Sequence, residues 1–228
     1  MTDMKDATSF HLRCVDSTSP YRRIDEAMEG FDPSTVEQLE RPIMKGTLCA
    51  ALFRADNLWY RARILGNAGK GELDVKFIDY GNSERVAESS LRKLPAHLLA
   101  FEPQAMPSAL AYIRAPRIDR PFGPQAGKYL QRHGLNQVHD AVVVESQAGQ
   151  PLRVILMEEG EEDWTNSLNA FMLSEGLTVL EKYVSESSDD LPEQVAAWAE
   201  FENEARANTR GLWQHGNANG LLDEEEDY

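Results

Sequence analysis

A series of short strand-like segments, all within about fifty residues, constrains the fold more than any other feature of this sequence. The residues between these segments are rich in Gly, Asn and Asp, which is typical of hairpin loops. The segments span residues 47–53, 59–65, 72–78, 83–87 and 90–95. Strands this short, joined by tight connections, predict a small and strongly twisted β-barrel over residues 41–95.

The sequences on both sides of this barrel mix strand and helix patterns. Strand-like residues occur at 9–15 and 108–114, and a β-hairpin is expected from 139–146 and 151–159. Helices are expected where the sequence has capping residues or repeats apolar residues at every third or fourth position. The expected helices span residues 20–28, 32–41, 121–134, 165–176 and 191–213. The helix at 32–41 would have Asp32 as its N-cap and Pro33 as its first residue. The predicted fold class is α+β, mainly β with some α, as a barrel capped by helices.

The charges are distributed unevenly along the chain. There are 23 Lys and Arg against 38 Asp and Glu, so the net charge is −15, but residues 41–93 hold 10 basic and 6 acidic residues. A mildly cationic barrel therefore lies within an acidic frame, and such a frame disfavours non-specific binding to nucleic acid. Five consecutive acidic residues, 223–227, predict a disordered acidic tail over 217–228.

Several protein classes are not expected. The sequence has no apolar run long enough for a membrane span and no signal peptide at its start, so no membrane partner is expected. Cys14 and Cys49 are its two cysteines, and we expect two buried thiols in a reducing intracellular compartment rather than a disulfide or a metal site.

No catalytic constellation is recognisable either. The glycines of 66–72 lack the spacing of a phosphate-binding loop, and a strand follows them instead of a helix. The acidic residues 158–163 are interpreted as a solvated loop, and none of the five histidines is paired with a nucleophile. We therefore expect no catalytic residue, no metal ligand and no cofactor.

Aromatic residues are concentrated in the predicted barrel. Phe53, Trp59, Tyr60, Phe77 and Tyr80 lie within 28 residues. One interpretation is that strands favour aromatic residues and that the rings fill the barrel core. The other is a cage of ring faces for an alkylated cation, because the ring quadrupole attracts such a group. Phe77 and Tyr80 can converge only if the chain bends at Asp79, which the following Gly-Asn favours.

Three motifs resemble a Tudor domain in their order and spacing: WYRAR at 59–63, FIDYGN at 77–82 and LRKLP at 91–95. Residues 166–181 and 202–216 resemble the last two helices of a staphylococcal-nuclease-like domain. Together they resemble the extended Tudor module that ends the proteins of the Tudor staphylococcal nuclease family. The resemblance implies a Tudor barrel inserted in a nuclease-like OB-fold domain with capping helices. Residues 1–40 would supply its N-terminal strand, helices and linker helix, 41–95 the barrel, 96–216 the remaining OB-fold, and 217–228 the tail.

The resemblance also implies a function. Phe53, Tyr60, Phe77 and Tyr80 would form a cage for symmetrically dimethylated arginine, and Asn82 would orient the guanidinium. The implied partners are proteins with symmetrically dimethylated Arg/Gly-rich tails, of the Sm type or the Piwi/Argonaute type, in RNA metabolism, silencing or splicing. The chain would be a monomeric reader in the cytoplasm, with the nucleus as a second location. It would not be an enzyme, because any nuclease activity would belong to repeats upstream of this segment.

Two alternatives stay open from the sequence. The first is direct binding of single-stranded RNA by the OB-fold and Tudor surface, with Arg61, Arg63, Lys76 and Arg85 as a basic stripe. Steep loss of affinity with added salt would favour RNA, whereas dependence on methylation would favour the reader. The second is residual calcium-dependent nuclease activity.

Overall fold

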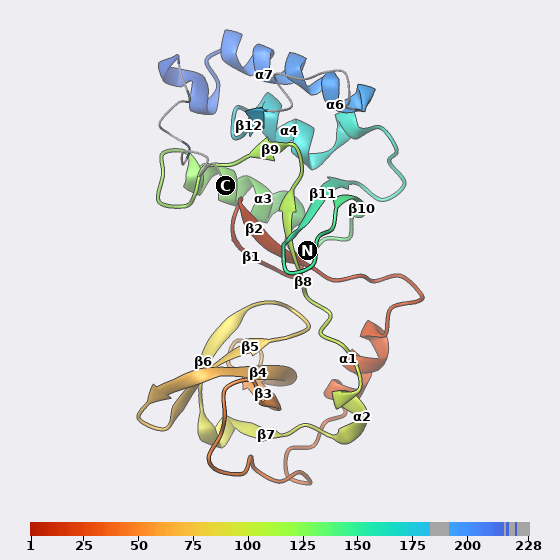
Figure 1. Ribbon diagram of the computed structural model, residues 1–228, viewed down its shortest axis with the longest axis vertical. Coiled ribbons are helices and arrows are strands. Elements are labelled where there is room, and N and C mark those ends of the chain that lie inside the picture. The colour runs from red at the N-terminus through yellow and green to blue at the C-terminus, as the bar shows by residue number, and fades with distance from the viewer. Residues whose placement is uncertain (183–191, 217, 219–221, 223–228) are drawn as a thin grey trace. The chain divides into compact units, whose positions relative to one another are not determined.

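The computed structural model describes residues 1–182, 192–216, 218 and 222. Contacts between residues divide it into two compact units. One comprises Thr2 and residues 11–106, and the other comprises Met1, residues 3–10 and the described part of 107–228. The boundaries expected at residues 40, 95 and 216 stay predictions, and the first unit is wider than the barrel expected at 41–95. The mixed α+β architecture of the chain confirms the predicted fold class (Figure 1).

The first unit is built on a five-stranded antiparallel sheet with the strand order β6-β5-β4-β3-β7. Its strands are β3 (Leu48–Phe53), β4 (Leu58–Gly69), β5 (Glu72–Phe77), β6 (Ser83–Ala87) and β7 (Leu91–Lys93), with a short 3-10 helix η1 (Glu88–Ser90) before the last. All five predicted strands are present. The loop expected at 66–71 is much shorter, because β4 continues to Gly69 through two register shifts that bend it along β5.

Small residues face the inside of this barrel. Cys49, Ala51 and Ala62 are fully buried and pack with Ile64 and Val75. These small side chains leave room for the larger residues of the same core, Leu73, Phe77, Val86 and Leu91. Cys49 is buried as expected, but Cys14 is exposed, so the expectation of two buried thiols was wrong for Cys14.

Two helices cover the outer face of this sheet. Helix α1 (Tyr21–Glu29) confirms the predicted helix at 20–28, and a short helix α2 (Ala96–Leu99) follows β7. Ile24 and Met28 of α1 pack with Leu98 of α2 against Ala50, which points outward from β3. The apolar stripe of α1 therefore leaves its polar stripe, including Asp25 and Glu29, away from this second core.

The prediction of a helix at 32–41 was wrong, because the structure describes this whole segment and shows turns there instead. Asp32 does accept hydrogen bonds from the backbone N–H and hydroxyl of Ser34, but it caps a turn. The chain then runs beside β7, where the Glu37 carbonyl accepts a hydrogen bond from the Lys93 N–H, and Leu39 packs on the barrel core. The edge of the sheet thus offered this segment a tertiary partner that outweighed its helical pattern.

The second unit contains a sheet with the strand order β1-β2-β8-β11-β10. Its strands are β1 (Asp3–Asp6), β2 (Ser9–Leu12), β8 (Met106–Leu110), β10 (Asp140–Glu145) and β11 (Leu152–Met157). The predicted hairpin is formed by β10 and β11, and β11 runs parallel to β8. A two-stranded sheet joins β9 (Ile113–Arg114) to β12 (Val179–Leu180).

Helices pack around this sheet. They are α3 (Gly123–Gly134), the 3-10 helix η2 (Trp164–Asn166), α4 (Leu168–Ser174), α6 (Glu193–Ala196), α7 (Trp198–Ala207) and the 3-10 helix η3 (Gly211–His215). The N-cap of α4 is Ser167, whose hydroxyl oxygen accepts a hydrogen bond from the N–H of Ala170. The single long helix expected at 191–213 was also wrong. The helix is interrupted at Ala197, between α6 and α7, and α7 ends at Ala207. The chain then turns at Gly211, where φ is +49° and a Cβ atom would lie 2.2 Å from the carbonyl oxygen of Gly176.

Candidate aromatic binding site

The register of the barrel strands places three of the predicted cage rings on one face of the sheet. Tyr60 lies opposite Ala51, two residues before Phe53, and Phe77 lies opposite Ala62, two residues after Tyr60. Because side chains alternate along a strand, Phe53, Tyr60 and Phe77 all point inward at the same end of the barrel. Trp59 points outward and packs against Phe31, with ring centroids 5.5 Å apart.

Tyr80 joins these rings through a tight turn after β5. The N–H groups of Tyr80 and Gly81 both donate to the carbonyl oxygen of Phe77. Gly81 has φ = +105°, and a Cβ atom there would lie 2.2 Å from the ring of His11. The turn therefore depends on glycine, both for its backbone angle and for space. The bend that the sequence required at Asp79 is present.

The four rings meet edge to face around Tyr60. Its ring centroid lies 6.2 Å from Phe53, 6.0 Å from Phe77 and 5.1 Å from Tyr80, with interplanar angles of 76°, 83° and 75°. Phe53 and Phe77 are 5.2 Å apart. These nearly perpendicular planes are edge-to-face contacts, in which the rings touch one another without stacking. Phe77 is 1% exposed and belongs to the barrel core, whereas the other three rings are partly exposed.

Asn82 follows the same turn. Its carbonyl oxygen accepts a hydrogen bond of 2.9 Å from the N–H of Phe77, which fixes its backbone beside the rings. The Asn82 side-chain amide makes no hydrogen bond with any described residue, and the residue is partly exposed. The structure thus brings all five predicted site residues to one end of the barrel. Their role in binding stays a prediction.

Carboxylates hold the two tyrosine hydroxyls. The Tyr60 hydroxyl donates to Asp56 at 2.8 Å, and the Tyr80 hydroxyl donates to Asp25 of α1 at 3.4 Å. Burial, together with the neighbouring carboxylate, raises the pKa of Tyr60 and of Tyr80 above that of a free tyrosine. Both rings therefore stay neutral at physiological pH. Sequence reasoning missed both carboxylates. Asp25 is 55 residues from Tyr80, whereas Asp56 is four residues from Tyr60, so for Asp56 a local signal was present in the loop before β4.

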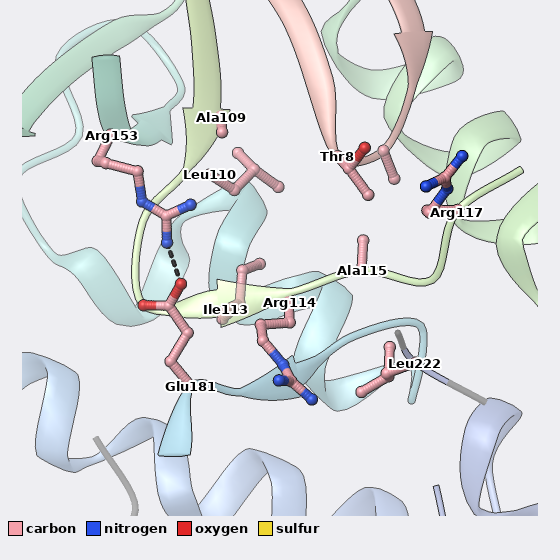
Figure 2. Close-up of a pocket in the computed structure, with 11 residues that line it drawn as sticks. Thr8, Ala109, Leu110, Ile113, Arg114, Ala115, Arg117, Arg153, Glu181 and Leu222 are labelled. Carbon is pink, nitrogen blue, oxygen red and sulfur yellow. Dashed lines mark hydrogen bonds and ion pairs between the residues drawn. The ribbon is translucent and has the colours of Figure 1, made fainter. Parts of the chain in front are cut away.

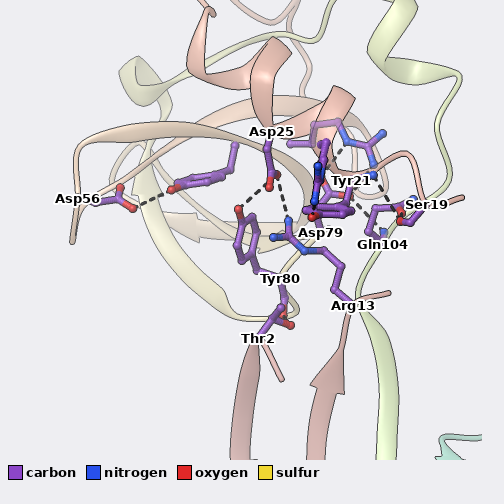
Figure 3. Close-up of polar contacts among 12 residues, drawn as sticks. Thr2, Arg13, Ser19, Tyr21, Asp25, Asp56, Asp79, Tyr80 and Gln104 are labelled. Carbon is purple, nitrogen blue, oxygen red and sulfur yellow. Dashed lines mark hydrogen bonds and ion pairs between the residues drawn. The ribbon is translucent and has the colours of Figure 1, made fainter. Parts of the chain in front are cut away.

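Arg13 completes the surroundings of Tyr80 (Figure 3). Its guanidinium centre lies 4.6 Å from the Tyr80 ring centroid, and its Nη1 atom lies 3.0 Å from Oδ1 of Asp25. Burial opposes the charge of Arg13, but Tyr80 and Asp25 raise its pKa above the ordinary value. A cation already lies on one face of Tyr80, which shows that this ring environment accepts a guanidinium.

The basic stripe considered for RNA binding does not form as expected. Arg61 is buried, with 1% exposure, and its guanidinium is bonded to Asp79. Arg63 and Arg85 are exposed, but Arg85 is paired with Asp74 at 3.1 Å. The prediction of a stripe that includes Arg61 was wrong, because the N–H donors of its buried guanidinium are bonded to Asp79 and to backbone carbonyl oxygens of residues 98–102.

A separate cavity of about 380 Å³ lies in the second unit (Figure 2). Three arginines line it, Arg114, Arg117 and Arg153, and Glu181 is the acidic residue among its described lining residues. Glu181 forms an ion pair with Arg153. Within the described residues, no group of three or more His, Cys, Asp or Glu side chains is placed to hold a metal ion.

The acidic residues 158–163 are mostly exposed, as expected. Glu161 accepts hydrogen bonds from the N–H groups of Glu162 and Asp163, and Asp163 accepts one from Thr165. These carboxylates thus stabilise local turns. Among the described residues, no helix has the length and apolar character needed to cross a membrane.

The fold and the ring cluster define a Tudor-type barrel joined to a nuclease-like OB-fold unit. Comparison with known families agrees: residues 1–112 match the Tudor domain family, and residues 108–215 match the staphylococcal nuclease homologue family. The chain therefore combines a Tudor domain with a staphylococcal-nuclease-homologue domain. This confirms the resemblance inferred from the motifs.

Several known proteins are similar to this chain. Ribonuclease TUDOR 2 of Arabidopsis thaliana is 33% identical over 191 residues, which cover 75% of this chain and 19% of the relative. The chain thus spans about a fifth of that relative's length. The extended Tudor domain of Drosophila melanogaster Tudor-SN has a similar fold, with a TM-score of 0.78 and 24% identity over 93% of this chain and 95% of that one. The extended Tudor domain of human TDRD1, solved in complex with a symmetrically dimethylated peptide, has a TM-score of 0.66 and 22% identity over 79% and 87%.

Proposed function

We propose that this chain binds symmetrically dimethylated arginine in Arg/Gly-rich protein segments. The observation that carries the proposal is the convergence of Phe53, Tyr60, Phe77 and Tyr80, with the unengaged amide of Asn82, at one end of the barrel. The human TDRD1 structure, which holds a symmetrically dimethylated peptide, supports it by its similar fold.

The chemistry of methylation explains why rings are suited to this ligand. Methylation leaves the guanidinium charged and planar, but it removes N–H donors and adds apolar surface. The modified group is therefore less costly to desolvate, and it gains attraction from the ring faces. Asn82 would accept or donate one hydrogen bond that fixes the orientation of the group. With cation–π contacts of about 1–2 kcal/mol, we expect micromolar affinity.

Acidic side chains around the rings support the same ligand. Asp25 and Asp56 each bond one tyrosine hydroxyl, and Glu29 lies one helical turn beyond Asp25 on α1. Their charges would raise the association rate of a cationic peptide. Proteins with Sm-type or Piwi-type tails, in RNA silencing or splicing in the cytoplasm and nucleus, are the partners we propose for a monomeric reader. The nuclease-like unit would act as a scaffold for the barrel.

The test is a calorimetric titration of one Arg/Gly peptide in unmethylated and symmetrically dimethylated forms. We expect the chain to prefer the methylated form, and we expect Tyr80→Ala to weaken its binding by roughly tenfold. Phe171→Ala is a matched control, because it removes an exposed aromatic ring from the nuclease-like unit. Equal affinity for both peptide forms would exclude the reader. Affinity that falls steeply with salt and ignores methylation would favour RNA-type electrostatic binding.

A further inference from the structure

A small cavity borders Tyr60 and Tyr80 on the side of helix α1. It has a volume of about 70 Å³. Its lining residues come from α1, β4 and the turn after β5: Asp25, Met28, Glu29, Leu58, Trp59, Tyr60 and Tyr80. Neither Phe53 nor Phe77 lines it. The cavity is thus a neighbour of the proposed cage that shares two of its rings.

The lining of this cavity combines an apolar wall with two carboxylates. Met28, Leu58 and Trp59 offer surface for an aliphatic stem. Asp25 and Glu29 are four residues apart on α1, so their side chains lie on the same face of the helix and repel each other. Arg13 offsets part of this repulsion through its ion pair with Asp25, and a second cation beside Glu29 would relieve the rest. A side chain with an aliphatic stem and a cationic end matches both parts of the lining.

Arg13 shows how a guanidinium binds to these groups. It lies over Tyr80 and bonds Oδ1 of Asp25, the same oxygen that accepts the Tyr80 hydroxyl (Figure 3). Oδ2 of Asp25 makes no hydrogen bond with any described residue, so it is left for a second donor. The chain itself therefore demonstrates the chemistry of an arginine held jointly by Tyr80 and Asp25.

We propose that this cavity is a subsite for a second, unmethylated arginine of the ligand. The inference rests on the proposed function, because the methylated arginine would occupy the adjacent cage. In an extended Arg-Gly-Arg segment the two arginines are about 7 Å apart and project to the same side. The rings of Tyr60 and Tyr80, whose centroids are 5.1 Å apart, would lie between the methylated guanidinium in the cage and the unmethylated guanidinium in the cavity.

The two subsites would differ in the methylation state that they accept. Carboxylates bind a guanidinium through its N–H donors, and methylation removes some of these donors. The cavity with Asp25 and Glu29 would therefore prefer the unmodified group, whereas the cage would prefer the methylated one. A ligand with alternating modified and unmodified arginines would satisfy both.

The experiment compares peptides with one symmetrically dimethylated arginine and a variable residue two positions before or after it. With the wild-type chain, replacing a flanking Arg by Ala should lower the affinity by about two- to fivefold. Lys at that position should bind less well than Arg, because it lacks the planar fork of donors. The Glu29→Gln and Asp25→Asn variants should bind the Arg and Ala peptides with nearly equal affinity.

Glu26→Gln is the matched control, since Glu26 is exposed on the same helix and does not line the cavity. It should keep the preference for the flanking arginine. Equal binding of the Arg and Ala peptides by the wild-type chain would overturn the subsite. So would an equal loss in Glu26→Gln and Glu29→Gln, which would indicate general attraction by an acidic helix. Failure of the reader itself would look different, because no peptide would then bind in a methylation-dependent way.

Discussion

Arg61 and Asp79 form a buried two-point ion pair, in which Nε and Nη2 of Arg61 lie 2.8 and 2.5 Å from the two carboxylate oxygens. Arg61 follows Tyr60 on β4, and Asp79 precedes Tyr80 in the turn after β5. The remaining N–H donors of Arg61 bond the carbonyl oxygens of Leu98, Phe101 and Glu102. The pair therefore ties the strand and the turn that carry the two tyrosines to α2 and to the segment that follows it.

Removing one partner of this pair should be costly. We expect Asp79→Asn to lower the free energy of unfolding by about 3–5 kcal/mol, because a buried guanidinium would lose its compensating charge. Urea unfolding measures this change. The control is Asp74→Asn, which breaks the exposed pair with Arg85 and should cost less than about 1 kcal/mol. Similar losses in the two variants would show that burial of the pair has no special weight.

The turn at Gly81 should tolerate no side chain. Gly81→Ala would place a Cβ atom 2.2 Å from the His11 ring, and the residue has φ = +105°. Gly69→Ala is a matched control, because Gly69 also has a positive φ, +83°, but no atom lies within 4 Å of its Cβ position. Positive φ costs alanine about 1–2 kcal/mol, so we expect a loss near this size for Gly69→Ala. The melting temperature of Gly81→Ala should be clearly lower, and equal melting temperatures would contradict the close contact.

The ring of Tyr60, rather than its hydroxyl, should matter for ligand binding. Tyr60→Phe removes the hydrogen bond to Asp56 but keeps the edge-to-face contacts with three other rings. We expect this variant to keep methylated-peptide affinity within about twofold. Tyr60→Leu should lose roughly tenfold, because an aliphatic side chain has no ring quadrupole. Fluorescence anisotropy of a labelled peptide measures both, and a larger loss in Tyr60→Phe would assign the main role to the hydroxyl.

Cys49 should be protected from alkylation in the folded protein. Burial raises its pKa from 9.0 to about 12, so the thiol stays protonated well above the pH at which an unfolded cysteine ionises. Iodoacetamide at pH 9 should therefore modify exposed Cys14 first and Cys49 only in urea, as read by mass spectrometry of the peptides.

The same shift has a consequence for stability. The pKa of Cys49 is higher in the folded chain than in the unfolded chain. The contribution of the protonated thiol to the free energy of unfolding is therefore fully present below pH 9 and is lost as the pH rises towards 12. A Cys49→Ala variant should show a smaller decrease in unfolding free energy over this range than the wild-type chain. An identical pH dependence in both proteins would exclude Cys49 as a source of this loss.

Local patterns in the sequence predicted much of the fold. Short apolar runs and their turn residues were sufficient for β3 to β7, and the apolar spacing of residues 20–28 was sufficient for α1. These features depend on near neighbours along the chain. The helix expected at 32–41 does not form, because Lys93, more than fifty residues away, bonds this segment instead. Its N–H donates to the carbonyl oxygen of Glu37, and its ammonium group donates to the carboxylates of Glu37 and Glu40. A pattern within one segment contains no information about such a partner.

The site divides in the same way. The sequence by itself predicted which residues form the candidate site: Phe53, Tyr60, Phe77, Tyr80 and Asn82 come from the resemblance to a Tudor domain, and their role in binding stays a prediction. Only the tertiary structure decided that Ala51 lies opposite Tyr60, which sets the faces of the rings, and that Arg61 is buried while Asp25 and Arg13 surround Tyr80. The physical reason is that strand register and burial depend on the summed free energy of contacts between distant segments, and not on any one of these segments alone.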